Sequence, residues 1–212
     1  MVDHHLLRAI KDELADLKRK NQDLVLENSH LWKVIRQLNK FSCEDRYRYS
    51  SNGIRNLMHE ILSVSLEAVS SSNGSVLLFD QEKNQLVFVT VIGDRKTELA
   101  GYRIPADEGI AGWVSTHQKP ALVPDVRQDR RWLSAVDQSI GFHTSGIIAV
   151  PLRSGRRNLG VIEVVNSLKD KPFSESDLEI LQLIAHFTSF VIRMMEETLQ
   201  EESARKIWQN LN

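Results

Sequence analysis

The sequence has one cysteine, Cys43, and no long apolar run. A single cysteine cannot form an intrachain disulfide, which is typical of proteins that fold in a reducing compartment. No apolar stretch approaches the ~18 residues of a membrane-spanning helix, and the N-terminus has no signal-peptide core. We therefore expect a cytoplasmic protein that does not associate with membranes.

The chain also lacks a strong excess of positive or negative charge, and it lacks known catalytic signatures. The net charge of −1 gives no general attraction to nucleic acid, so we expect no direct nucleic-acid binding. The chain has no phosphate-binding loop, no GxSxG, no HExxH and no CxxC motif. His117 and His143 lack the spacing of metal ligands, so we predict no metal site. These absences favour a protein that is not an enzyme, and they indicate no particular cofactor.

A heptad repeat is the clearest pattern that is present, and it occupies residues 1–40. Leucines recur every seven residues at one core position, while two asparagines interrupt the other, an arrangement that favours a parallel two-stranded coiled coil. Apolar residues at flanking positions widen the seam, so a helical bundle and a single helix packed on its own domain are alternatives. The predicted dimerisation residues are Leu14, Leu17, Asn21, Leu24, Asn28, Leu31, Ile35 and Leu38.

Residues 41–52 are polar and charged, and we interpret them as a linker. One domain is then expected over 53–199, with a helical extension over 200–212. The apolar spacing predicts a helix from Gly53, closed by the turn-rich segment 70–74, and two hairpins with strands at 75–79, 85–92, 146–152 and 159–166. Ser174 and Asp177 form a capping-box arrangement that starts a long last helix.

The stretch 107–132 lies between the two hairpins and is expected to cover the sheet. Gly109 and Gly112 leave one side of a short helix bare, so that its backbone can lie close to the sheet. A short strand at 121–123 and a loop rich in Asp and Arg follow. The fold class predicted is α+β: an antiparallel sheet with helices on one face and a helical and loop cover on the other, plus an N-terminal coiled-coil helix.

The motif GIAGWV, followed by PALVPDV and then GVIEVVN with Phe173 and Asp177, resembles the GAF domain family over residues 53–195. The resemblance implies a sensor module that binds a small molecule between sheet and cover and passes a signal along flanking helices. Members bind cyclic nucleotides, bilins, haem, metals, amino acids or other metabolites, and many serve only as dimerisation units.

Two departures narrow these options. Cyclic-nucleotide-binding members carry an Asn-Lys and Phe-x-x-x-Asp-Glu pattern, but here Ser167 and Leu178 replace the lysine and the glutamate. The lysine–aspartate pair of that pattern therefore cannot form. Bilin-binding members attach their pigment through a cysteine, and there is none between residues 107 and 145. A covalently bound bilin is not expected.

The candidate ligand-binding residues belong to the cover and to one face of the strands. Strand alternation places Ser75, Leu77, Ala149 and Val165 on one face together with two of the candidates. Charged and aromatic cover residues can contact a polar or planar ligand, although capped turns and packing are alternative roles for them. Glu163 contacts a ligand if it faces the cavity, and solvent if it does not. The candidates are Trp113, Val123, Asp125, Asp129, Arg130, Trp132, Ser145, Ile147 and Glu163.

We therefore expect a non-enzymatic homodimeric sensor, with a small-molecule ligand beneath residues 107–132 and an effector domain or partner protein downstream. One alternative is a ligand-free dimerisation module or a fragment of a larger signal-transduction or transcription regulator. Another is an enzyme resembling the methionine sulfoxide reductases built on GAF domains, for which Cys43 is misplaced.

Overall fold

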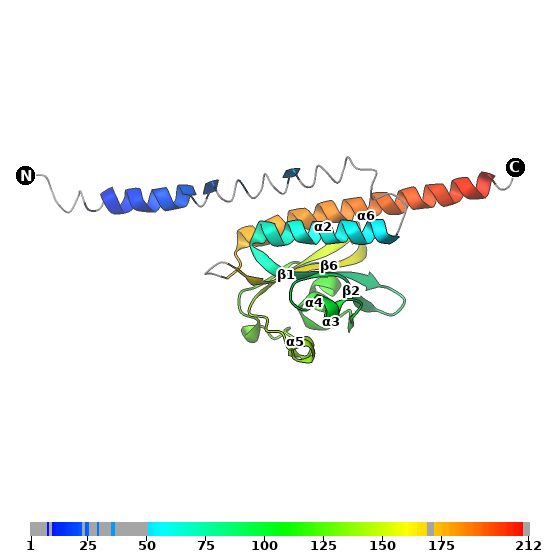
Figure 1. Cartoon of the computed structure of the whole chain (residues 1–212), viewed down its shortest axis with the longest axis horizontal. Coiled ribbons are helices and arrows are strands. Elements are labelled where there is room, and N and C mark those ends of the chain that lie inside the picture. Colours follow the sequence, from blue (N-terminus) through cyan, green and yellow to red (C-terminus); the bar gives the residue numbers. More distant parts are fainter. Residues whose placement is uncertain are drawn as a thin grey trace, which may run out of the picture.

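The computed structural model describes residues 8, 10–22, 24, 25, 29, 35, 36, 51–168 and 172–209, with side chains described for 55–168 and 172–193 of the two long ranges. Residues 10–22 are helical. The predicted linker lies largely outside the described residues. Figure 1 shows the arrangement of the domain that follows.

A six-stranded antiparallel sheet forms the centre of this domain. Its strands lie in the order β3-β2-β1-β6-β5-β4, so the two hairpins meet where β1 pairs with β6. The expected α+β class and the antiparallel sheet are confirmed. The strands are β1 (Ser71–Asp80), β2 (Gln85–Ile92), β3 (Arg103–Pro105), β4 (Ala121–Val123), β5 (Ile147–Ser154) and β6 (Arg157–Ser167).

Two long helices, α2 (Ser51–Val69) and α6 (Glu175–Gln209), cover one face of the sheet. Ile61 and Leu62 of α2 and Leu181 and Ile184 of α6 are fully buried there, packed over strand residues such as Ile162. The predicted capping box is present, because the Asp177 carboxylate accepts hydrogen bonds from the Ser174 amide at 2.8 Å and from its hydroxyl at 2.8 Å. α6 extends past the sheet in Figure 1, and it continues without a break through the boundary expected at 199.

The opposite face of the sheet is covered by short elements, as the sequence predicts. They are α3 (Lys96–Leu99), α4 (Gly109–His117), the 3-10 helix η2 (Val126–Gln128) and α5 (Ser134–Ile140). Ile110 and Val114 of α4 pack on Leu77, Ala149 and Val161 of the strands, which forms a second apolar core. The sheet is therefore buried on both faces.

Three local expectations were wrong. The segment 70–74, expected to be a turn, begins strand β1 at Ser71, because this strand pairs with β6 from Ser71 onward. α2 begins at Ser51, within the expected linker. A Cβ on Gly112 would lie 2.7 Å from the Asp107 carbonyl carbon. This glycine therefore makes room for the backbone of the turn before α4, and not for the sheet as expected.

The heptad residues in the described part of the N-terminal helix are exposed in the single chain. Leu14, Leu17 and Leu24 keep 50%, 59% and 63% of their surface, so they do not pack on the domain of their own chain. Among the predicted dimerisation residues, Asn28, Leu31 and Leu38 lie outside the described residues. The coiled coil itself stays a prediction. None of the described helices combines the length and apolar character that crossing a bilayer requires.

Candidate functional site

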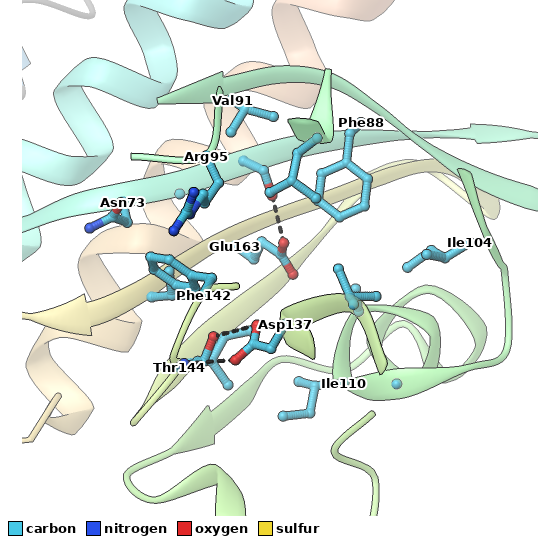
Figure 2. Close-up of a pocket in the computed structure, with 18 of the residues that line it drawn as sticks. Asn73, Phe88, Val91, Arg95, Ile104, Ile110, Asp137, Phe142, Thr144 and Glu163 are labelled. Atoms are coloured by element: carbon cyan, nitrogen blue, oxygen red, sulfur yellow. Dashed lines mark hydrogen bonds between the residues drawn. The ribbon is translucent and has the colours of Figure 1, made fainter. Parts of the chain in front are cut away.

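A cavity of about 100 Å³ lies between the central strands and the cover. Its floor is formed by β1 and β6, and its walls by β2, α4, α5 and the segments around them (Figure 2). Apolar side chains dominate, with several polar groups among them. The lining comprises Asn73, Gly74, Ser75, Phe88, Val91, Ile92, Arg95, Leu99, Ile104, Glu108, Gly109, Ile110, Ala111, Trp132, Leu133, Val136, Asp137, Ile140, Phe142, Thr144, Ile147, Glu163 and Val165.

Glu163 is the acid on the floor of this cavity. It stands opposite Ser75 in the β1–β6 pairing, and the Ser75 hydroxyl donates a hydrogen bond of 2.6 Å to its Oε1. Protein surrounds the carboxyl, and the intermediate exposure of Glu163 is to the cavity that it lines. Burial raises the pKa of Glu163 to about 7, an effect that the Ser75 hydrogen bond opposes and the charge of Asp137 reinforces. Near neutral pH this carboxyl therefore changes its charge.

Asp137 ties α5 to the chain that leads into β5. Its Oδ2 accepts a hydrogen bond of 2.7 Å from the Thr144 amide, and its Oδ1 accepts one of 3.1 Å from the Thr144 hydroxyl. Figure 2 shows this pair on the side of the cavity that faces Glu163. Two acidic side chains from different elements therefore line one small space.

Arg95 is the basic residue of the lining, and protein groups hold its guanidinium. Nη2 donates a hydrogen bond of 2.8 Å to the Gly141 carbonyl, and Nη1 lies 3.4 Å from Glu98. Its Nε is buried without a hydrogen-bond partner. The bond to Gly141 links the end of β2 to the end of α5, so it closes one side of the cavity.

Three of the predicted ligand-binding residues line the cavity: Trp132, Ile147 and Glu163. The strand alternation that placed Glu163 on one face with Ser75 and Val165 agrees with the structure. The remaining six lie outside the lining. These are Trp113, Val123, Asp125, Asp129, Arg130 and Ser145.

The charged residues of the cover pair with each other, which explains their position outside the cavity. Asp125 accepts two hydrogen bonds of 2.9 Å from the Arg127 guanidinium, and Asp129 accepts bonds of 2.9 and 2.6 Å from Arg131. The arginine hydrogen bonds hold the pKa of both carboxyls below its usual range. The alternation of Asp and Arg therefore stabilises two tight turns.

Three of the four other candidates also contact protein groups. Trp113 stacks on His117 at 4.7 Å between ring centroids, and the Arg131 guanidinium covers its ring at 4.4 Å. Val123 is buried in β4, and Arg130 is exposed. The amide and hydroxyl of Ser145 donate to Asn166 Oδ1 at 2.7 and 3.0 Å.

The sequence reasoning missed several lining residues that carry polar groups, among them Arg95, Asp137 and Thr144. Nothing in their local pattern marks them, because α5 has no side-chain cap and Arg95 follows a strand end. Phe88 had a signal, since its parity with Leu86 in β2 places both in the core beneath the cover. No cluster of His, Cys, Asp or Glu in the described part of the chain could hold a metal ion.

Comparison with known proteins shows which family and which relatives this chain resembles in sequence. The profile of the GAF domain family matches residues 51–193. The cone cGMP-specific 3',5'-cyclic phosphodiesterase subunit alpha' of Gallus gallus is 34% identical over 89 residues, which covers 42% of this chain. The match covers 10% of the length of that relative.

Solved structures share the fold. The GAF domain from a phosphoenolpyruvate-protein phosphotransferase (ptsP) of Coxiella burnetii is similar with a TM-score of 0.66 and 16% identity, over 80% of this chain and 96% of that one. The free methionine-R-sulfoxide reductase of Neisseria meningitidis, solved in complex with its substrate, is similar with a TM-score of 0.63 and 20% identity. The match covers 78% of this chain and 89% of that one. The profile match, together with the two-faced sheet and its cover, shows that the chain belongs to the GAF domain family.

Proposed function

We propose that this protein is a non-enzymatic, homodimeric sensor, in which a small molecule bound beneath the cover changes the packing of the helices on the other side of the sheet. The observation that carries the proposal is the cavity itself. It places a buried carboxyl, Glu163, at the floor of a mostly apolar space. A buried ionisable group costs free energy unless it is paired, so such a group in a cavity favours a ligand-binding role.

The lining supports binding in preference to catalysis. It contains no cysteine and no histidine, the side chains that most often act as nucleophile or general base at neutral pH. The Ser75 hydroxyl donates to Glu163, and the Thr144 hydroxyl donates to Asp137. The polar groups are therefore arranged to receive hydrogen-bond donors.

The sheet supplies a short route from the cavity to the long helices. Glu163 faces the cavity, while its neighbours Ile162 and Val164 pack under α2 and α6. A Cβ on Gly74 would meet the Glu163 carbonyl oxygen at 2.7 Å and Leu66 of α2 at 3.0 Å. The helix therefore lies directly behind the strand pair that holds the acid. A ligand that moves β6 must also move the surface on which α2 rests.

The helices also offer surfaces for a second copy of the chain. Leu183 and Phe190 lie seven residues apart on α6 and keep 48% and 50% of their surface. The exposed leucines at 14, 17 and 24 continue the same kind of surface on the N-terminal helix. We propose a parallel dimer through these helices, with an effector domain or partner protein receiving the signal.

Thermal-shift screening tests ligand binding. A ligand that binds only the folded state raises the melting temperature, by mass action, as its concentration exceeds the Kd. Metabolite amines, amino acids and nucleotides belong in the screen. Cyclic GMP is included because the Gallus gallus relative named above is a cGMP-specific phosphodiesterase, although Ser167 and Leu178 disfavour it.

A pocket-filling variant shows where a hit binds. Val136→Trp introduces a large side chain from α5 into the cavity and is expected to abolish the shift. Gln138→Trp, on the exposed side of the same helix, is the matched control and is expected to keep it. A screen with no hit, or a hit that survives Val136→Trp, would contradict binding in this cavity.

The parallel seam predicts the effect of its two asparagines. Replacing Asn21 and Asn28 together by Leu removes the polar pairs that specify a two-stranded register, so the oligomeric state or helix register is expected to change. Light scattering with chemical cross-linking measures the change. A dimer that is unchanged in size and cross-linking pattern would count against this seam.

A further inference from the structure

We infer that the ligand is a small organic cation, with a protonated amine or amidinium group attached to an apolar, preferably aromatic body. This inference rests on the proposed function and specifies the ligand class of the same cavity. Four observations support it: the charges of the lining, the free capacity of Glu163, the apolar walls and the size of the space.

The charges of the lining favour a cation. Three carboxyl-bearing residues, Glu108, Asp137 and Glu163, line the cavity together with one arginine, Arg95. Arg95 is held by the Gly141 carbonyl and by Glu98. An anionic ligand would therefore enter a space where acids outnumber bases and where both terminal nitrogens of the one guanidinium are already engaged, which leaves only its Nε without a partner.

Glu163 has free capacity to accept hydrogen bonds. A carboxylate offers roughly four lone-pair sites, and the structure assigns one donor, the Ser75 hydroxyl, to this one. Asp137, in contrast, accepts two hydrogen bonds from Thr144. An ammonium or amidinium group carries two or more donors and a compensating charge, so it provides what the buried Glu163 carboxylate lacks.

Aromatic side chains surround the acid. Phe88 and Phe142 lie on either side of Glu163 in Figure 2, and Trp132 also belongs to the lining. Aromatic faces attract cations and also pack against apolar bodies. The walls therefore suit the carbon skeleton of an amine and reinforce the binding of its charged end.

The size of the cavity limits the ligand. A space of about 100 Å³, where a single water needs roughly 10–15 Å³, accommodates a ligand of roughly ten non-hydrogen atoms. Phenylalkyl amines and benzamidine have this size. A nucleotide is larger than this space.

A matched ligand series tests the inference. The probes are 2-phenylethylamine and benzamidine as cations, 2-phenylethanol as the neutral counterpart, and 3-phenylpropionate as the anion, each measured by isothermal titration calorimetry on the full chain at pH 8.0 and pH 5.5. At pH 8.0 the Kd of the amine is expected to be at least about tenfold lower than that of the alcohol, from one charge-assisted pair. The propionate is expected not to bind.

Glu163→Gln keeps the shape of the side chain and the hydrogen bond from Ser75 but removes the charge. At pH 8.0 this variant is expected to raise the Kd of the amine about tenfold and to change the Kd of the alcohol by less than about twofold. At pH 5.5, where Glu163 is protonated, wild type and variant are expected to bind the amine equally. Glu179→Gln, at an exposed position on α6, is the control and is expected to leave all four affinities unchanged.

The outcomes separate the ligand class from the sensor function. If the alcohol or the propionate binds as well as the amine, the cation inference is wrong and the proposed function stands. If the amine binds wild type and Glu163→Gln equally at pH 8.0, Glu163 does not recognise the cation and the inference is also wrong. If none of the four probes binds, the inference is overturned, and the Val136→Trp comparison on hits of the wider screen decides the proposed function independently.

Discussion

Replacing Glu163 by Gln is expected to increase the free energy of unfolding at pH 8 by roughly 3 kcal/mol and to leave it almost unchanged at pH 4.5. Burial raises the pKa of this carboxyl from 4.5 to about 7 in the folded protein. At pH 8 the wild-type protein must therefore bury a charge, whereas the glutamine side chain of the variant would remain neutral and keep the Ser75 contact. The variant avoids this cost of burying a charge.

The sign follows from proton linkage. Below pH 4.5 Glu163 is protonated in both the folded and the unfolded chain, so its contribution is constant. Between pH 4.5 and 7 only the folded chain retains the proton, so wild-type stability falls as the pH rises. Above pH 7 the loss is complete. The difference between variant and wild type should therefore grow over this window and then level off.

Urea unfolding at pH 4.5, 6 and 8 measures this difference. Comparison with Glu179→Gln, an exposed carboxylate on α6, removes effects of net charge. A difference between Glu163→Gln and wild type that does not vary with pH would show that Glu163 is not a buried titrating group.

Gly160→Ala is expected to destabilise the domain by about 4 kcal/mol or more. Gly160 lies in β6 at φ +149°, a conformation that residues with a side chain rarely adopt. A Cβ at this position would overlap the carbonyl oxygen of Leu77 in β1, and it would also approach the Leu78 Cα at 2.9 Å. Because both contacts are with the backbone of the central strand pair, no side chain can move aside to relieve them.

Gly155→Ala is the matched control on the same hairpin. Gly155 also has a positive φ of +59°, but nothing lies within 4 Å of a Cβ there. Its substitution is expected to cost about 1–2 kcal/mol, because alanine, unlike glycine, is strained at a positive φ. Urea unfolding measures the free energy of unfolding of the two variants. If Gly160→Ala does not fold, circular dichroism of its soluble fraction shows the loss of secondary structure. Equal stability of the two variants would contradict the close approach of β1 and β6.

Patterns that depend on immediate neighbours could be predicted from the sequence. The alternation in β5 and β6 placed Ile147, Glu163 and Val165 on one face, because side chains in a strand have a fixed period of two. The Ser174–Asp177 cap was predictable because its partners lie three residues apart. The cover was predictable as a region but not in its contacts.

What could not be predicted depends on partners distant in the chain. Ser71–Gly74 has a turn composition, yet it pairs with β6, about ninety residues away. Asp137 and Arg95 enter the lining through contacts with Thr144 and Gly141, which no local pattern indicates. Charge alone also could not show that Asp125 and Asp129 are neutralised two residues away. A charge pattern that suggests a binding loop and one that stabilises a turn are alike in sequence.

The central claim is that a small molecule occupies the cavity above Glu163, and native mass spectrometry of protein purified from its own host tests it most directly. The expected result is a noncovalent adduct of small-metabolite mass on wild type and Gln138→Trp, released on denaturation and missing from Val136→Trp. An adduct carried equally by Val136→Trp, or its absence from all three proteins together with no hit in the ligand screen, would contradict the claim.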